Sequence, residues 1–194
     1  RIDSLEQEKL LPVFDWAGLG LRRVGVVVHR WLRVICEQGL ENWGRERIRN
    51  SAALLRRDLL RTGMGDSDVE SLFYKAEGAL INAVSDDTGR WILSLRENGA
   101  CEYAVSGLLD GKVVNAVIDR TFEDENGTRW VIDYKTGTHS GGGLSDFLDR
   151  EQHRYSLQME RYGLLMKNFS GAAVRLGLYF PMIPAWRQWG LSEE

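Results

Sequence analysis

Residues 113–137, VVNAVIDRTFEDENGTRWVIDYKTG, decide the fold of this chain. They contain an apolar run with an acidic residue at its end, Asp119, followed by a polar turn and a second apolar run that ends in Asp133 and, two residues later, Lys135. Side chains at positions i and i+2 of a β-strand point to the same face, so Asp133 and Lys135 are expected side by side. Two carboxylates on neighbouring strands, with a lysine beside the second, form a compact site for a divalent metal ion and a phosphate group.

The residue types at this site match the needs of phosphodiester hydrolysis. The reaction requires an activated water molecule and neutralisation of charge on the phosphoryl oxygens, and a metal ion held by carboxylates supplies both. Hard oxygen ligands favour Mg²⁺ or Mn²⁺. Asp119 and Asp133 would be ligands, with the backbone carbonyl of Tyr134 as a third candidate, and Lys135 would stabilise the charge of the transition state. The site therefore indicates a metal-dependent nuclease.

The alternative is a surface ion pair between Asp133 and Lys135, which would contribute about 0–1 kcal/mol to stability. Both carboxylates, however, emerge from strongly apolar segments, as Ile118 and the Val131-Ile132 pair show. Buried strands that end in charged side chains favour the functional interpretation.

Composition narrows the class of protein. With 194 residues and 43% hydrophobic content, the chain can bury the core of one domain. Its net charge of −3 is unlike that of most nucleic-acid-binding proteins. Residues 20–65, however, contain ten arginines and no lysine against four acidic residues, which gives this part a surplus of six positive charges. Arginine-rich helices of this kind are expected either to follow phosphates or to form a solvated or docking face.

The sequence counts against several kinds of binding site and against a membrane protein. Cys36 and Cys101 cannot form a four-thiolate zinc or iron–sulfur centre, and we expect two reduced thiols in a cytoplasmic protein. No run approaches the roughly 18 apolar residues of a membrane span. The phosphate-binding loop motif Gly-x-x-x-x-Gly-Lys-Ser/Thr is absent, so no ATP site of that type is expected.

Periodicity predicts helices first and a sheet afterwards. Residues 1–19 are expected to be a connecting segment, followed by helices over about 20–39 and 43–61 and by a third helix that a capping box, Ser67-x-x-Glu70, would open. Strands are predicted at 101–109, 112–123 and 129–135, with Asp110-Gly111 as a tight hairpin turn. A long helix over 144–169 and a strand over 173–180 follow, and the tail is expected to be a last strand or loose chain. This order predicts an α/β or α+β fold. Because the chain starts at Arg1 without a methionine, we expect it to be a piece of a longer protein.

Several motifs carry a family resemblance. Asp119 in an apolar strand, followed by VIDYKTG at 131–137, resembles the PD-(D/E)xK nuclease superfamily and, more narrowly, the RecB-like nuclease domain at the C-terminus of helicase–nucleases of the UvrD, AddA and RecB type. His29 resembles the family's helix histidine, Gln158 and Tyr162 resemble its Gln-x-x-x-Tyr motif, and Glu102 stands where these domains often have an acidic residue. The resemblance spans about residues 20–183.

The resemblance implies a restriction-endonuclease-like core, which is a mixed β-sheet flanked by helices, with a helical N-terminal part. Residues 20–194 would form a single nuclease domain, divided into a helical part at 20–98 and a sheet-and-helix catalytic core at 99–183. His29 would join the two aspartates and the Tyr134 carbonyl as ligands of Mg²⁺ or Mn²⁺. Gln158 and Tyr162 would engage DNA, with Arg30 as a lesser candidate. Glu102, also a lesser candidate, would support the metal ligands or be one of them.

By the same resemblance, the chain would be a DNA nuclease, in the first instance an exonuclease, of a bacterial, cytoplasmic, ATP-dependent helicase–nuclease in double-strand break repair and recombination. Its partners would be DNA ends, helicase motor domains in the same full-length chain and a candidate second helicase–nuclease subunit, with no membrane. The four cysteines that hold an iron–sulfur cluster in some relatives are missing, so no such cluster is expected.

Two alternatives stay open. The domain could be a catalytically silent DNA-binding or scaffolding module, or a free-standing enzyme on the same fold, such as a phage-type exonuclease. Metal titration separates the first alternative from a nuclease, because a scaffold has no reason to bind Mn²⁺ through a histidine and two aspartates. The non-methionine start and the missing cluster cysteines count against the second alternative.

Overall fold

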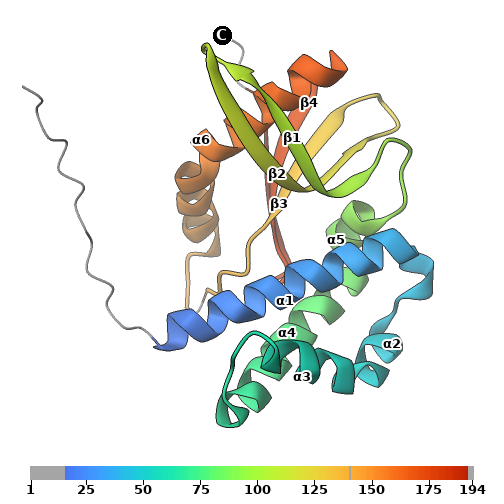
Figure 1. The fold of residues 1–194 in the computed structure, drawn as a ribbon, viewed down its shortest axis with the longest axis vertical. Helices are drawn as coiled ribbons and strands as arrows, with labels where there is room; N and C mark the ends of the chain where they lie inside the picture. The colour runs from blue at the N-terminus through green and yellow to red at the C-terminus, as the bar shows by residue number, and fades with distance from the viewer. Residues whose placement is uncertain (1–15, 140, 192–194) are drawn as a thin grey trace, which may run out of the picture.

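A five-stranded sheet in the order β1-β2-β3-β4-β5 forms the centre of the protein, in a computed structural model that describes residues 16–139 and 141–191 (Figure 1). Neighbouring strands are antiparallel except β3 and β4, which are parallel. A parallel pair cannot be joined by a tight turn, and the helix α6 (Leu144–Ser170) provides the required crossover. The strands are β1 (Ala100–Leu109), β2 (Lys112–Glu123), β3 (Arg129–Tyr134), β4 (Val174–Phe180) and β5 (Ala185–Gly190).

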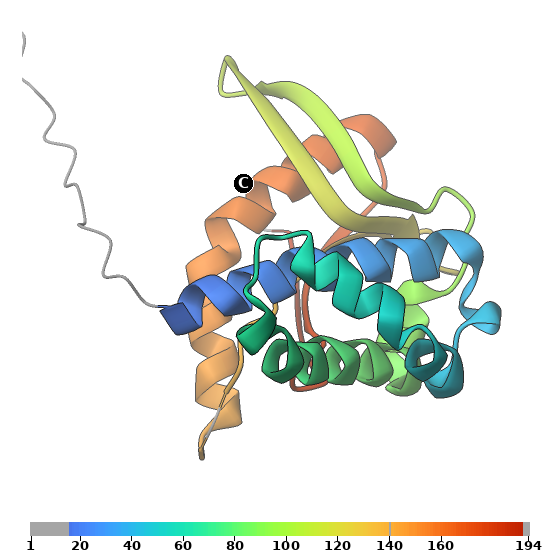
Figure 2. The ribbon, with the colours of Figure 1, turned by 60° about the horizontal axis from the view of Figure 1, so that its bottom comes forward.

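The remaining helices precede the sheet in the chain and gather together below the hairpin of the first two strands in the view of Figure 2. The mixed sheet, its flanking helices and the helical N-terminal part confirm the predicted α/β (α+β), restriction-endonuclease-like class. Within the described residues, none of the helices is both long and apolar enough to cross a bilayer. These N-terminal helices are α1 (Trp16–Gln38), the 3₁₀ helix η1 (Leu40–Asn42), α2 (Arg45–Asn50), α3 (Ala52–Leu60), α4 (Asp66–Ser85) and α5 (Asp87–Leu93).

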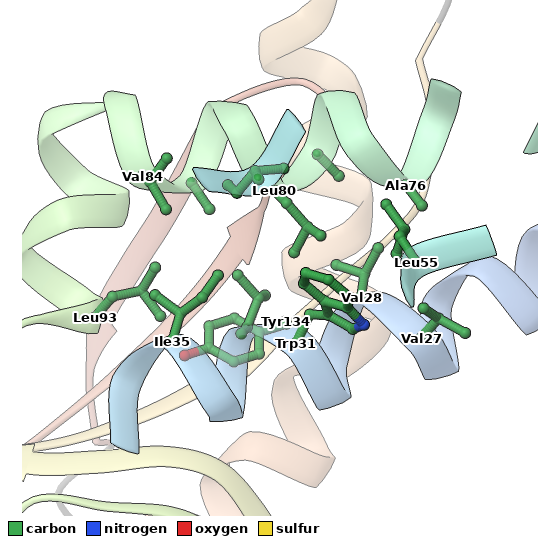
Figure 3. Packing of buried hydrophobic residues seen from close by; sticks show 14 of the residues in the cluster. Val27, Val28, Trp31, Ile35, Leu55, Ala76, Leu80, Val84, Leu93 and Tyr134 are labelled. Carbon is green, nitrogen blue, oxygen red and sulfur yellow. The ribbon is translucent and has the colours of Figure 1, made fainter. Parts of the chain in front are cut away.

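Strand β3 lies between two hydrophobic clusters. Ile132 and Tyr134 pack in the cluster formed with α1 to α5, whereas Val131 packs in the cluster formed with α6. Figure 3 shows Tyr134 beside Ile35 of α1. All six residues of β3 are buried, as expected for a strand with both faces covered. The end of this strand, which carries the Asp-Tyr-Lys motif, is therefore held rigidly.

The predicted strand boundaries are confirmed to within a residue, and the tail contains a fifth strand, β5. The predicted helix over 43–61 is wrong as a single helix, because it breaks at Ser51. The Ser51 hydroxyl donates to the carbonyl of Arg47 at 2.8 Å, and the Ser51 carbonyl accepts the amides of Leu54 and Leu55. Ser51 therefore ends α2 and begins α3.

Two further predictions about helix ends need correction. Helix α4 begins at Asp66, after Gly65 as the N-cap residue, so Ser67 lies inside the helix and the predicted capping box is wrong. The short helix α5 was not predicted, although its N-cap is well formed: the Asp86 carboxylate accepts the amide of Gly89 at 2.9 Å. Helix α1 begins at Trp16, four residues earlier than expected. The rest of the predicted connecting segment, residues 1–15, lies outside the described residues.

A cluster of indole rings joins β5 to the rest of the sheet. The ring centroid of Trp186 on β5 lies 6.0 Å from that of Trp130 on β3 and 6.2 Å from that of Trp91 on α5. The ring lies against Gly177 of β4, where a β-carbon would overlap the indole. The absence of a side chain at Gly177 thus lets Trp186 complete the cluster.

We expect Gly177→Ala to lower the free energy of unfolding by about 1–3 kcal/mol, because the added methyl group must displace a packed indole. Urea denaturation followed by circular dichroism measures the change. The matched control is Gly190→Ala on β5, where no atom lies within 4 Å of the added carbon. Equal stability of the two variants would contradict this account of the packing.

Candidate active site

Three side chains from three elements converge at the end of the sheet nearest α1. His29 comes from α1, Glu102 from β1 and Asp119 from β2, and one ligand atom of each lies within 4.8 Å of the others. His29 Nδ1 is 3.4 Å from Asp119 Oδ2. All three residues are half-buried. The structure therefore brings together a histidine and two carboxylates that are separated in sequence by more than 70 and by 17 residues.

Glu102 reaches this position because strand β1 changes its facing there. Cys101 packs against the cluster on the α1 side, and Tyr103, two residues later, packs against the cluster on the α6 side, whereas in a regular strand they would share a face. Glu102 between them has a positive φ of 49°. Such a conformation costs a residue other than glycine about 1–3 kcal/mol, and outside turns it is often found at functional sites. The flanking strand pairs place Glu102 opposite Asp119, so the distortion lies at the site itself.

The backbone of β3 fixes the orientation of Asp119. The amide of Tyr134 donates to Asp119 Oδ2 at 2.7 Å. The Tyr134 ring is buried and meets the His29 imidazole edge-on, with ring centroids 5.6 Å apart. One residue of β3 thus positions both the carboxylate and the histidine. The surroundings of the Tyr134 carbonyl give no evidence about its predicted role as a ligand.

Negative charge accumulates around His29. Burial alone would lower the pKa of the imidazole, but the hydrogen bond and the charge of Asp119, together with the charges of Asp133 and Glu102, raise the pKa above its ordinary value. The pKa of Asp133 is raised to about 6, first by burial and then by the charge of Asp119. Both shifts indicate a pocket in which carboxylates crowd together and a bound cation would be stabilised.

Asp133 and Lys135 form an ion pair next to this cluster. Asp133 Oδ2 lies 2.7 Å from Lys135 Nζ, and both side chains are largely buried. The approach is too oblique for a hydrogen bond, so this buried Oδ2 has no aligned donor among the described residues. Lys135 Nζ also lies 3.6 Å from the centroid of the Tyr155 ring on α6. The ammonium group is therefore held between a carboxylate and an aromatic face.

These donors fit a hard divalent cation. The cluster supplies one imidazole nitrogen and two carboxylates, and Asp133 adds a carboxylate oxygen that lacks an aligned hydrogen-bond donor. Asp133 itself does not belong to the group of described residues whose ligand atoms lie within 4.8 Å of one another. The geometry therefore brings Glu102 closer to His29 and Asp119 than the sequence indicated, and it leaves Asp133 paired with Lys135.

A hollow of about 570 Å³ opens beside the cluster, along one face of α1. Helix α1 lies close to the segment that follows β3. A β-carbon added at Gly25 would lie only 2.7 Å from the Thr136 hydroxyl oxygen. Positively charged side chains line the wall of the hollow opposite the carboxylates. The lining residues from α1 include Arg22, His29, Arg30 and Arg33, and those from the sheet side are Glu102, Asp119 and Thr136.

The motif on α6 lies on the same helix face as the aromatic contact to Lys135. Gln158 Nε2 donates to the Tyr162 hydroxyl oxygen at 2.9 Å. Tyr155 precedes Gln158 by three residues and Tyr162 by seven, which places the three side chains along one face. Gln158 and Tyr162 make no hydrogen bond to the carboxylates in the described part of the chain. Sequence reasoning missed Tyr155, and the signal that could have revealed it is this helical spacing.

No curated protein is significantly similar to this chain. A solved structure titled "Crystal structure of SSO0001" is similar over 92% of this chain and 78% of its own, at 15% sequence identity and a TM-score of 0.35, which is too weak to support an argument. The family model described as "PD-(D/E)XK nuclease superfamily" matches residues 10–185. Since this match covers nearly the whole sequence, the chain belongs to the PD-(D/E)XK nuclease superfamily.

Proposed function

We propose that this domain hydrolyses phosphodiester bonds of DNA with the help of Mg²⁺ or Mn²⁺. The observation that carries the proposal is the convergence of His29, Glu102 and Asp119 within 4.8 Å, beside the ion pair of Asp133 and Lys135. Membership of a nuclease superfamily supports the same reaction class. The buried negative charge at the site is the electrostatic requirement for holding a cation that then contacts a phosphate.

In this proposal His29, Asp119 and Asp133 hold the metal ion, with Glu102 as a fourth ligand and the Tyr134 carbonyl as a further candidate. When bound, the ion acts as a Lewis acid on a phosphoryl oxygen and lowers the pKa of a bound water. The Tyr134 amide keeps Asp119 in position as a ligand. We include Glu102 among the ligands because its carboxylate lies in one cluster with His29 and Asp119.

Lys135 acts on the phosphate. Its ammonium group is a compact charge that would stabilise the developing negative charge of the transition state. Contacts with Asp133 and with the Tyr155 ring restrict its motion, so little entropy is lost when it meets the substrate. Gln158 and Tyr162 are proposed to contact the DNA backbone from α6, and Arg30 to contact it from α1.

The biological setting is proposed from the resemblance of the motifs alone. The helix histidine, the Asp-Tyr-Lys strand and the Gln-x-x-x-Tyr helix resemble those of RecB-like domains. We infer a nuclease domain that includes α1 from Trp16 onward and that is joined on its N-terminal side to helicase motor domains of a longer chain, with a second helicase–nuclease subunit as a candidate partner. Digestion of DNA from its ends in break repair, in a bacterial cytoplasm, follows from the same resemblance. The silent scaffold is the competing proposal, and retention of Asp119, Asp133 and Lys135 counts against it.

Cleavage of end-labelled linear DNA, single- and double-stranded, tests the function directly. We expect cleavage with Mg²⁺ or Mn²⁺, none with EDTA, and a loss of at least about a hundredfold in Asp133→Asn, because losing a ligand carboxylate should cost at least as much as the roughly 10- to 100-fold typical of an outer-shell partner. Without metal ions, the Asp133→Asn protein should be at least as stable as the parent. The substitution removes a buried negative charge next to Asp119. The control is Asp110→Asn in the exposed β1–β2 turn, where asparagine tolerates the positive φ. Full activity of Asp133→Asn would contradict the assignment.

Substitution of Lys135 separates catalysis from metal binding. We expect Lys135→Met to bind Mn²⁺ in calorimetry at least as tightly as the parent, because the substitution removes a competing cation from Asp133. The same variant should lose roughly 10²–10³ in kcat, because the transition state loses a stabilising charge. If Lys135→Met lost both Mn²⁺ binding and cleavage, the result would show that Lys135 supports the fold of the site instead.

Glu102 is tested by metal affinity. We expect Glu102→Gln to weaken Mn²⁺ binding by roughly 10- to 100-fold, since it removes a negative charge from the cluster while preserving the size of the side chain. Calorimetric titration measures the effect, with Glu151→Gln on α6 as a control outside the cluster. An unchanged dissociation constant would exclude Glu102 as a ligand.

A further inference from the structure

A second hollow adjoins the first on the other side of Arg30. Its volume is about 270 Å³, and it lies between α1 and the pair α2–α3. Arg30 lines both hollows, so the two lie on either side of this one side chain. The second hollow has a mixed lining of arginine and apolar side chains, which includes Arg30, Arg47 and Arg57 with Val34, Trp43 and Leu54.

The charge in this second hollow is positive and largely unneutralised. The side chains of Arg30 and Arg57 make no hydrogen bond or ion pair within the part of the chain that the structure describes. Asp58, the acidic residue of the lining, already has partners. Its carboxylate accepts a hydrogen bond from the Trp31 indole nitrogen at 3.1 Å, and its other oxygen lies 3.5 Å from Arg61 Nη1. Exposed guanidinium groups without a carboxylate partner attract a phosphate-bearing ligand.

The apolar part of the lining suits sugars and bases. Leu54 is 46% exposed and offers an apolar surface at the wall of the hollow. The guanidinium of Arg47 lies 4.2 Å from the centroid of the Trp43 ring, whose buried indole nitrogen has no partner among the described residues. A positive groove interleaved with apolar and aromatic side chains is the usual surface for a single nucleic-acid strand. The small volume disfavours a duplex, which is stiff and wide.

We propose that single-stranded DNA runs from the cluster of His29, Glu102 and Asp119 across Arg30 into this second hollow, where Arg57 and Arg47 bind its phosphates. This inference rests on the proposed function and specifies its substrate as a single strand. Arg22 extends the same line in the opposite direction, because it precedes Arg30 by eight residues on α1, roughly 12 Å along the helix. The helical N-terminal part would thus direct the strand towards the carboxylates.

Binding measured without cleavage tests the path. Fluorescence anisotropy with labelled oligothymidylates of about four and about twelve nucleotides, in EDTA, compares Arg57→Gln with Arg49→Gln. Both arginines are exposed and lie on neighbouring helices, but Arg49 does not line the hollow, so the pair is matched in charge and setting. We expect Arg57→Gln to weaken binding of the longer strand by roughly tenfold and to reduce its salt slope by about 0.7, the value for one phosphate contact on a single strand. Arg49→Gln should change the affinity less than twofold.

The outcomes separate this proposal from the nuclease itself. A selective effect of Arg57→Gln supports the path even if no DNA is cleaved under any condition, in which case only the proposed function fails. Equal effects of the two substitutions would reduce the result to net charge and overturn the path. Two further results would overturn the path. The first is duplex DNA that binds as tightly as the single strand and depends equally on Arg57. The second is binding of the longer strand that does not depend on Arg57, as expected if the hollow receives a protein segment.

Discussion

The hydrogen bond from the Tyr134 amide to Asp119 Oδ2 is the interaction on which the site depends. It joins the last residue of β3 to a side chain of β2 at 2.7 Å, beyond the last pair of that ladder, Arg120 with Ile132. The same residue places its ring against His29, so α1 is aligned by the same strand end. Since every residue of β3 is buried, this strand end cannot shift without disturbing both clusters of the core.

The electrostatic cost of the site explains why so much packing surrounds it. Burial and, after it, the charge of Asp119 raise the pKa of Asp133 to about 6, above its ordinary value of about 4. A carboxyl group with a raised pKa in the folded state prefers its proton there, so ionisation destabilises the metal-free fold as the pH rises through about 6. Lys135 and His29 offset part of this repulsion. A bound cation would remove the rest, which links metal binding to stability at neutral pH.

Much of this arrangement follows from sequence pattern. Strand alternation and the apolar runs were enough to predict β1 to β4 and the pairing of Asp133 with Lys135. The position of Glu102 could not be predicted, because residues 101–109 have the pattern of a regular strand and nothing in it indicates a positive φ. The break at Ser51 was hidden for a similar reason: its hydroxyl serves as a local hydrogen-bond partner, which helical periodicity does not record. Tyr155 escaped notice because a tyrosine on an amphipathic helix usually indicates packing.

The helical N-terminal part is no appendage to the catalytic core. Val28, Ile35 and Leu80 from its helices share one hydrophobic cluster with Phe122 and Ile132 from the sheet. Helix α1 also supplies His29 to the candidate metal site and one wall of the adjoining hollow. Removal of the helices would therefore expose one face of the sheet and take away a candidate ligand at the same time. The division of the chain at residue 98 describes the order of its elements, whereas the core and the site each require both parts.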